Sequence, residues 1–471
     1  MSANRSRLKL VLSRFLADYG MLLVLLLLCA YYSYVTWAEQ HPTGAAGGRQ
    51  LVRELAGAAT SGQRVLVVAG ESEEEAAFAE ALRDGLSAAG FQLVGVVKGK
   101  PADARAALDG LVKAGTGLDL IAANHVSATW SVFDNLGEKF PPFARTRIVT
   151  PRSYWWPDFL KRDNIRNVAD QIVVIAILAV GMTMVIITGG IDLSVGSLIA
   201  LSAVVSALLI RHAAGAERAS ALGMTFSSLG GIGVCALVGA VTGMLVTFAA
   251  IPPFIATLAV MLAASGLAYL LAAGQSVYQV PASFVWLGRG IAAAGVPNAV
   301  VLMALLYIAA HIVMSQTALG RYIYAVGGNA EAARLSGVPV KRIVIFVYAL
   351  CGALAGLGGV IMASQLRSGS PTYGGMYELY TIAAVVVGGT SLAGGEGKVF
   401  GTLIGAFIIA VIQNGMNLTK VESYTQKVVL GLVILGAVLL DRLKRPGVWK
   451  AVRSKFAGVG SAFRDRAKPP R

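Results

Sequence analysis

The sequence predicts an all-α polytopic membrane protein with about ten transmembrane helices, some of them broken, and a small extracytoplasmic α/β domain inserted near its start. Of the 471 residues, 56% are hydrophobic and only 14% are charged, with a mean hydropathy of +0.68. Soluble domains carry about 25% charged residues, so most of this chain belongs in lipid. One interval of ordinary soluble composition interrupts the apolar runs. We therefore divide the chain into a cytoplasmic N-terminal tail with the first transmembrane helix (1–39), the inserted domain (40–155), the transmembrane core (156–441) and a basic cytoplasmic tail (442–471).

The positive charges are distributed unevenly along the chain. The formal net charge is +15, and Lys and Arg concentrate from Arg5 to Arg14, from Arg321 to Arg342 and from Arg442 to Arg471. Membrane proteins carry such clusters on the cytoplasmic side. The pattern predicts that both termini lie in the cytoplasm, and it points to membrane lipid and not to nucleic acid as the partner of the basic charge.

Ten apolar runs have the composition of membrane spans. The first covers 19–37 and has no small-residue cleavage site after it, so we expect it to be retained. The run at 379–389 is short, as expected of a broken helix. An even number of crossings returns the C-terminus to the cytoplasm, in agreement with its charge. The remaining runs are 168–187, 198–210, 229–249, 254–272, 296–314, 345–362, 401–414 and 428–440.

The inserted interval has the pattern of alternating strands and helices. Residues 64–70 form an apolar run typical of a buried strand, and a helix is expected to start near Ser72. Further strands are expected at 91–97 and 118–122, with a second helix between them. This alternation predicts a small parallel α/β domain.

A polar, glycine-rich stretch separates two of the apolar runs. Residues 189–197 have the sequence Gly-Gly-Ile-Asp-Leu-Ser-Val-Gly-Ser. An acid at membrane depth is retained where it meets protein, water or cargo, and glycines allow the backbone to leave the helix. Two interpretations are open: part of a translocation site, or a short turn in which Asp192 caps the next helix. The candidate residues for a translocation core are Gly189, Gly190, Asp192, Ser194, Gly196 and Ser197.

A second segment carries signals for the start and end of a short helix. Asn329 is expected to cap a helix that ends at Gly337, and Pro339 prevents its continuation. A short helix parallel to the membrane suits docking to a cytoplasmic partner, and a plain amphipathic connector is the simpler interpretation. The residues assigned to coupling are Gly328, Asn329, Glu331, Ala332, Arg334 and Gly337.

The sequence contains no motif for covalent chemistry. The glycine cluster at 388–398 lacks the spacing of a phosphate-binding loop, and no zinc-binding or Ser-His-Asp pattern occurs. The three cysteines, Cys29, Cys235 and Cys351, fall within apolar runs without paired spacing. We therefore expect no catalytic residue, no metal site and no cofactor, so the chain is not expected to be an enzyme.

Four motifs, taken in order, resemble the ribose/xylose/galactose-type permease family of ATP-binding-cassette importers. They lie at 179–197, 251–258, 327–334 and 388–395, within a resemblance that covers 159–445. The resemblance implies a multi-pass subunit of the bacterial inner membrane that imports a monosaccharide or similar small polar solute. It also implies three partners: a separate cytoplasmic ATPase, a periplasmic solute-binding protein and a second permease subunit, which we expect to be an identical copy.

The resemblance implies roles for particular residues. The helix from Asn329 to Gly337 is similar to the coupling helix that sits in the ATPase groove, and 189–197 is similar to part of the translocation core. We expect Asp192 to hold a broken helix in shape by capping backbone N–H groups, because neutral sugars need no charge. The residues implied beside the pore are Pro253, Phe254, Thr257, Gly388, Gly389 and Thr390.

The inserted domain departs from most members of this family, which have only a short connection there. Residues 118–128 are similar to a strand-Ala-Asn-helix unit of periplasmic sugar-binding proteins, so the insertion looks like one lobe of that fold. Capture of sugar beside the pore would gain from effective concentration. Docking of a partner is favoured, because one lobe lacks the second wall of a ligand cleft.

Two other classes of function fit parts of the sequence. An ion-coupled secondary transporter would use Asp192 as a proton or sodium site, although such proteins carry more acids in their spans. A membrane sensor would use the insertion as its input, although the tail after Leu440 is short and basic for an output domain. Both are kept as alternatives to the importer.

Overall fold

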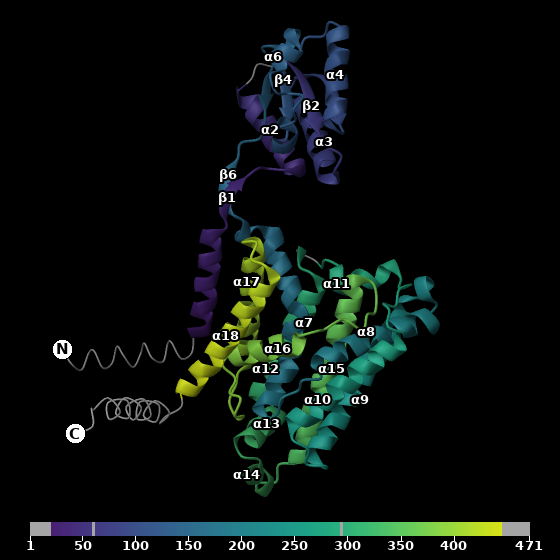
Figure 1. Ribbon diagram of the computed structural model, residues 1–471, viewed down its shortest axis with the longest axis vertical. Coiled ribbons are helices and arrows are strands. Elements are labelled where there is room, and N and C mark those ends of the chain that lie inside the picture. Colours follow the sequence, from purple (N-terminus) through teal and green to yellow (C-terminus); the bar gives the residue numbers. More distant parts are fainter. Residues whose placement is uncertain (1–19, 59–61, 293–294, 445–471) are drawn as a thin grey trace, which may run out of the picture. The chain divides into compact units, whose positions relative to one another are not determined.

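The chain separates into two compact units in the computed structural model, which describes residues 20–58, 62–292 and 295–444. The helical unit contains the residues up to Thr36 and from Phe159 onward, and the α/β unit contains Trp37–Asp158 (Figure 1). The basic cluster from Arg5 to Arg14 and most of the predicted basic tail lie outside the described residues. The cytoplasmic location of both tails therefore stays a prediction.

Within its described part, the helical unit has seven helices that are long and apolar enough to cross a membrane. Three shorter apolar helices, Gly20–Val35, α16 (Tyr377–Val387) and α18 (Ser423–Lys444), coincide with the other predicted runs. The count of ten crossings therefore stays a prediction. The seven long helices are α7 (Arg162–Ile187), α8 (Val195–His212), α9 (Ala221–Thr247), α10 (Pro253–Leu271), α12 (Asn298–Gln316), α15 (Val340–Leu366) and α17 (Val399–Leu418). The connections include η3 (Ala216–Arg218), η4 (Ala282–Val285), α11 (Trp286–Arg289), α13 (Ala318–Gly328) and α14 (Ala330–Leu335).

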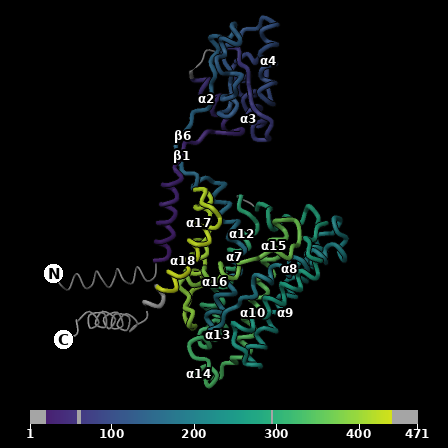
Figure 2. The backbone as a smooth tube through the Cα atoms, viewed as in Figure 1, coloured from purple at the N-terminus to yellow at the C-terminus, as the bar shows by residue number. Residues whose placement is uncertain are grey.

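Helix α7 runs through the middle of the helical unit (Figure 2). Its residues from Ile172 to Ile187 are all buried, and it packs against α12, α15, α16 and α17. Apolar composition alone does not set this position, because α9 and α10 are similarly apolar and largely exposed, so the contacts of α7 with four neighbouring helices define it. One close approach occurs at Gly181, where an added Cβ would lie 2.8 Å from the Cα of Cys351 on α15.

The α/β unit is built on a parallel sheet with the strand order β3-β2-β4-β5. Alternate residues of β2 face two separate apolar cores: Leu66 and Val68 lie in one, and Val65 and Val67 lie in the other. Burial on both faces explains why the strand is a continuous apolar run. The predicted parallel α/β fold is therefore present, although the side of the membrane it occupies stays a prediction. The strands are β2 (Arg64–Ala69), β3 (Gln92–Lys98), β4 (Leu120–Ala123) and β5 (Arg147–Val149), and the helical segments are α2 (Gly44–Ala58), α3 (Glu73–Ala88), α4 (Pro101–Lys113), α5 (His125–Ala128), α6 (Leu136–Lys139) and η1 (Pro141–Phe143).

A two-stranded antiparallel pair joins the two ends of the α/β unit. Strand β1 (Trp37–Gln40) pairs with β6 (Tyr154–Pro157), and Gln40 lies opposite Tyr154. The Gln40 side chain donates hydrogen bonds to the Trp156 carbonyl (2.9 Å) and to Asp158 Oδ1 (3.0 Å). No pattern in the sequence predicted this pair, which closes the unit Trp37–Asp158.

Candidate functional site

Residues 188–194 form a non-helical link between α7 and α8. Gly189 has a φ of +82°, a conformation that side chains disfavour. Asp192 is fully buried, and its Oδ1 accepts hydrogen bonds from the backbone N–H of Ser194 (2.9 Å) and from Ser194 Oγ (2.6 Å). The carboxyl group therefore closes the turn that precedes the first residue of α8. Ser194 is the N-cap residue of α8, so Asp192 holds the turn before the helix and does not itself cap a helical N–H group, and its role in transport stays a prediction.

The first turn of α10 is tied to this link by Thr257. Its Oγ1 lies within hydrogen-bond distance of the carbonyl of Ile191 (3.3 Å) and of the carbonyl of Pro253 (2.9 Å). Phe254, on the same turn, is an exposed apolar side chain. Of the three residues implied beside the pore on α10, Thr257 is thus the one that contacts the link.

A buried polar cluster from α15 lies beside Asp192, and no pattern in the sequence predicted it. An added Cβ at Gly190 would lie 2.4 Å from Tyr348 Oη, and the Cys351 thiol faces the Asp192 carboxyl group. Neither Asp192 Oδ2 nor Tyr348 Oη has a hydrogen-bond partner among the atoms of the described segments. Buried polar atoms without a partner cost about 1–3 kcal/mol each, so this cluster is a candidate for contact with water or solute.

Three segments that are distant in sequence meet at the end of α7, and we call this contact the glycine junction. It contains Ile187, Gly189, Gly327, Gly394 and Gly395. An added Cβ at Gly327 would lie 1.7 Å from the Ile187 carbonyl oxygen, and the N–H of Gly395 donates to the same carbonyl (2.9 Å). An added Cβ at Gly394 would lie 3.2 Å from the nitrogen of Gly189. Backbone thus packs directly on backbone between α7, α13 and the loop 388–398.

The predicted residues Gly388, Gly389 and Thr390 begin this loop. Gly388 packs against α17, where an added Cβ would lie 2.5 Å from the Gly401 carbonyl oxygen, and Gly389 has a φ of +90°. Thr390 is buried. The hydroxyl of Tyr324 on α13 donates to the Gly397 carbonyl (2.7 Å) at the other end of the loop. The structure therefore places these residues beside the glycine junction.

The short capped helix predicted after Asn329 is present as α14. Asn329 Oδ1 accepts a hydrogen bond from the N–H of Ala332 (2.9 Å), and Gly337 follows the helix with a φ of +82°. Glu331 and Arg334 form an exposed pair (Nε to Oε2, 3.0 Å), and this hydrogen bond lowers the pKa of Glu331. Helices α13 and α14 lie together at one end of the helical unit (Figure 1). The predicted helix is confirmed, and its coupling role stays a prediction.

The starts of α8 and α16 also meet, through a residue that the sequence analysis did not select. An added Cβ at Gly196 would lie 2.2 Å from Glu378 Oε2 and 2.7 Å from the Gly374 carbonyl oxygen. Ser197, the next residue, is half-buried. The available signal for Glu378 was an acid directly before the short apolar run at 379–389.

In the α/β unit, the carboxylate of Glu75 fills the position where comparable sheets bind ligands. That position lies at the carboxyl ends of β2 and β4, where the strand order reverses. Ser72 Oγ and Asn124 Nδ2 both donate to the carboxylate at 2.9 Å, and the Asn124 hydrogen bond is the main cause that lowers the pKa of Glu75. An added Cβ at Gly70 would lie 2.4 Å from Glu75 Oε2. The protein's own side chain therefore occupies the crevice.

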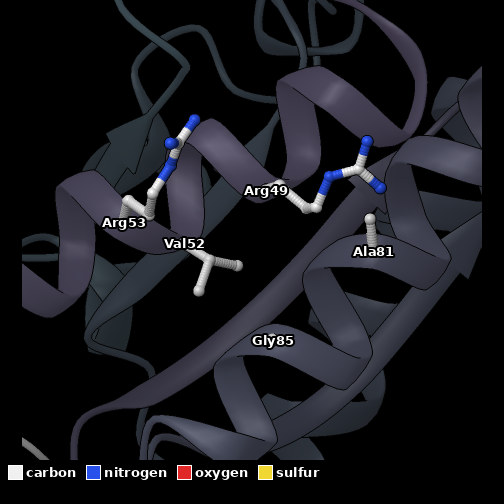
Figure 3. Close-up of a pocket in the computed structure, with 5 residues that line it drawn as sticks. All are labelled: Arg49, Val52, Arg53, Ala81 and Gly85. Atoms are coloured by element: carbon white, nitrogen blue, oxygen red, sulfur yellow. The ribbon is translucent and has the colours of Figure 1, made fainter.

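One depression on the α/β unit lies elsewhere, between α2 and α3. It has a volume of 330 Å³ and is lined by Arg49, Val52, Arg53, Ala81 and Gly85. Figure 3 shows the two arginine side chains leaving α2 in different directions, so they do not converge on one point. Within the described ranges, no three His, Cys, Asp or Glu side chains lie close enough together to hold a metal ion.

A family model of branched-chain amino acid transport system permease components matches residues 164–438. This match covers more than half of the chain and extends from α7 into α18. The chain belongs to this permease family. The resemblance inferred from the four motifs is therefore confirmed, and the α/β unit lies outside the matched residues.

Named relatives of this permease carry sugars. The ribose import permease protein RbsC of Escherichia coli K12 is 47% identical over 293 residues, which cover 61% of this chain and 88% of the relative. The D-allose transport system permease protein AlsC of the same organism is 37% identical over 287 residues, covering 60% and 85%. Its xylose transport system permease protein XylH is 35% identical, covering 61% and 87%. No solved structure matches this permease significantly.

Proposed function

We propose that this permease is the membrane-spanning subunit of an ATP-driven importer of a monosaccharide or similar small polar solute. The ribose, allose and xylose permeases among its relatives support a sugar cargo. The mechanism depends on the glycine junction. In this contact, the end of α13, directly before α14, touches the start of the link that contains Asp192.

The partners in this mechanism are those expected from the permease family. A permease of this family works with a separate ATPase and a substrate-binding protein. Closure of the ATPase moves α14, and the backbone contact between Gly327 and Ile187 transmits the movement to the end of α7. The link at 188–194 then moves, and the solute path opens to the other side of the membrane. The permease binds and moves solute, and the ATPase performs the hydrolysis.

The exposed side chains of the helical unit indicate what surrounds it. Large apolar residues such as Leu237, Leu262 and Leu305 are exposed on α9, α10 and α12. These faces suit lipid or a second permease subunit, and we assign the pore to a homodimer in the bacterial inner membrane, with both termini in the cytoplasm. The multi-pass membrane location follows from the family and from the seven apolar helices.

A reconstituted transporter tests the proposed function. Vesicles that contain the permease and its ATPase, supplied with the binding protein and ATP, are expected to accumulate labelled ribose, allose or xylose. Replacing the phosphate-binding lysine of the ATPase is expected to abolish uptake. Uptake that survives this replacement and follows an imposed proton or sodium gradient would instead establish a secondary transporter.

Exchanging the charges of the α14 pair is expected to weaken binding of the ATPase about tenfold, which corresponds to about 1.4 kcal/mol. The double variant Glu331→Arg, Arg334→Glu keeps an oppositely charged pair three residues apart but reverses it against the helix dipole, at a small cost for an exposed pair. Its outward charge pattern is reversed at the contact with the partner. Co-purification of the ATPase with the permease, together with ATP-driven uptake, measures the effect.

A matched control for this exchange is present on η3. Glu217 and Arg218 are adjacent, exposed and oppositely charged, and they lie in the connection between α8 and α9. Reversing both charges there is expected to leave ATPase binding and uptake unchanged. If the α14 exchange also leaves the complex and uptake intact, the coupling assignment is wrong.

We further propose that the α/β unit is a docking platform for the solute-binding protein and not a site of sugar capture. The crevice between β2 and β4 is filled by Glu75, which is held by Ser72 and Asn124. His41 and His125 stack with ring centroids 3.5 Å apart close to Asn124 in the chain. A ligand would have to displace these contacts, whereas docking leaves them in place.

Removing the α/β unit is expected to lower uptake roughly tenfold when the binding protein is scarce, because tethered docking raises its effective concentration. The pairing of Gln40 with Tyr154 allows a two-residue Asn-Gly turn to join the strands in place of 41–153. Uptake is expected to recover as the concentration of binding protein rises. Unchanged uptake at every concentration, with a normal amount of permease–ATPase complex, would contradict the docking role.

A further inference from the structure

The chain between α15 and α16 has an irregular backbone with exposed residues. After Leu366, residues 367–376 contain no helix, and Met376 has a φ of +69°. Thr372, Gly375 and Met376 are exposed, as is Leu379 on the first turn of α16. This segment therefore presents backbone as well as side chains at the surface of the helical unit.

Contacts of the segment place its end at membrane depth. Gly374 packs on Ile199 and on the Gly196 carbonyl of α8. One turn further along α8, the Ser202 hydroxyl donates to the Gly356 carbonyl of α15 (2.7 Å). Gly356 lies in the middle third of α15, which has 27 residues and is about 40 Å long at about 1.5 Å per residue. Because the hydrocarbon core is about 30 Å thick, the middle of α15 lies inside it.

Lipid cannot cover such a surface at this depth. Each unsatisfied backbone group in hydrocarbon costs several kcal/mol, so irregular backbone occurs there only against protein or against a water-filled cavity. The exposed start of α16 therefore faces one of these two environments.

The position of Glu378 helps to distinguish a protein environment from a water-filled one. Its side chain is half-buried, its Oε2 approaches Gly196, and it takes part in none of the ion pairs found in the described ranges. A carboxylate at membrane depth is retained where it meets polar protein groups, water or cargo. Asp192 is fully buried and held by Ser194, whereas Glu378 is half-buried beside the exposed residues Gly375 and Met376, so an aqueous environment fits its carboxylate best.

We infer that the exposed start of α16 lines the aqueous path of the solute, and that the Glu378 carboxylate accepts hydrogen bonds from the hydroxyl groups of the sugar that passes it. The inference rests on the proposed sugar import. Two neighbours support the chemistry. The rings of Tyr377 and Tyr380 pack edge to face on the same helix (6.4 Å), and Ser197 adds a half-buried hydroxyl from α8. A carboxylate and a hydroxyl group can form hydrogen bonds with sugar hydroxyls, and an aromatic ring offers an apolar face to the C–H groups of a sugar.

Cysteine labelling tests the aqueous path without any need for transport. In a Cys29→Ser background, which leaves only the buried Cys235 and Cys351, Met376→Cys and Glu378→Cys are treated with a water-soluble, membrane-impermeant thiosulfonate. Thiols react as thiolates, which form in water and not in lipid. We expect both to react about tenfold faster than Leu262→Cys and Leu237→Cys.

The two leucines are matched controls because they are more exposed than Met376 and differ only in their expected surroundings. Leu262 is 66% exposed and Leu237 is 64% exposed, both in the middle of long apolar helices, against 47% for Met376. Reaction of Met376→Cys as slow as that of the leucine positions would overturn the aqueous path. Such a result would leave the proposed sugar import standing, since the ATPase test is independent of it.

Sugar contact is tested by the coupling ratio of the reconstituted transporter. We expect Glu378→Ala to lower the sugar moved per ATP hydrolysed about tenfold while ATP hydrolysis stays within about twofold, and Glu378→Gln to retain an intermediate ratio. Glu422→Gln, at an exposed acid between α17 and α18, is the control and is expected to behave as the unchanged protein. An unchanged ratio in Glu378→Ala would overturn the contact, and parallel loss of hydrolysis and transport in both Glu378 variants would assign the residue to folding instead.

Discussion

Gly327→Ala is expected to reduce the yield of assembled transporter at least tenfold. The new Cβ would lie 1.7 Å from the Ile187 carbonyl oxygen and 2.6 Å from the Gly395 nitrogen, so the obstacle is backbone on both sides. A flexible side chain could turn away, whereas here α7, α13 or the loop 388–398 must move as a whole. Overpacking of this kind costs about 1–3 kcal/mol or more. The measurement is the amount of monodisperse permease–ATPase complex, followed by ATP-driven sugar uptake.

A glycine with open space around it is the matched control. Gly266 lies within α10, and an added Cβ there would meet nothing within 4 Å. Gly266→Ala is therefore expected to keep full assembly, helped by the higher helix propensity of Ala. Equal yields from the two variants would show that backbone does not pack on backbone at the glycine junction, and the proposed route from α14 to α7 would fall with it.

Asp192→Leu is expected to abolish assembly or uptake, whereas Asp192→Asn is expected to keep much of both. Leucine removes the acceptor for the N–H and Oγ of Ser194, and these buried donors then cost about 1–3 kcal/mol each. Asparagine retains an oxygen at the position of Oδ1 and so retains the turn that starts α8. Sugar uptake and the thermal midpoint of the purified complex measure the difference.

An exposed acid serves as the control for this pair of variants. Asp163, in the first turn of α7, has a side chain that is 91% exposed, and its replacement by Leu is expected to change the thermal midpoint little. If Asp192→Asn and Asp192→Leu lose uptake equally while both assemble normally, the negative charge itself is required. That outcome would favour an ion-binding role for Asp192 over its role in holding the turn.

Features set by local sequence were predictable. The capped helix after Asn329 depends on one side chain and on the backbone of Ala332, three residues away, so the sequence predicts it directly. The strand at Arg64–Ala69 is equally local, because burial on both faces requires a continuous apolar run. The hydrogen bonds from Ser194 to Asp192 are also local, but the sequence placed Asp192 at the cap of α8, whereas the structure has Ser194 there.

Features set by distant contacts were not predictable. Glu378 meets Gly196 and Tyr348 meets Gly190 across more than a hundred residues, and no periodicity in one sequence reports such a pairing. Helix α2 escaped prediction for a related reason. Its glycines lower helix propensity, and it is stabilised by tertiary packing, in which Gly48 lies against Phe78 and Ala81 of α3.

The antiparallel pair of β1 and β6 has a consequence for how this permease arose. The chain leaves the helical unit at Thr36 and returns at Phe159, whose N–H donates to the Thr36 hydroxyl (3.1 Å), and the intervening unit begins and ends on paired strands. A gene segment that encodes such a unit adds no membrane crossing. It could therefore enter or leave an ancestral permease gene in a single in-frame event without reversing the orientation of any later helix. The same property makes this position suitable for inserting a foreign domain or a reporter.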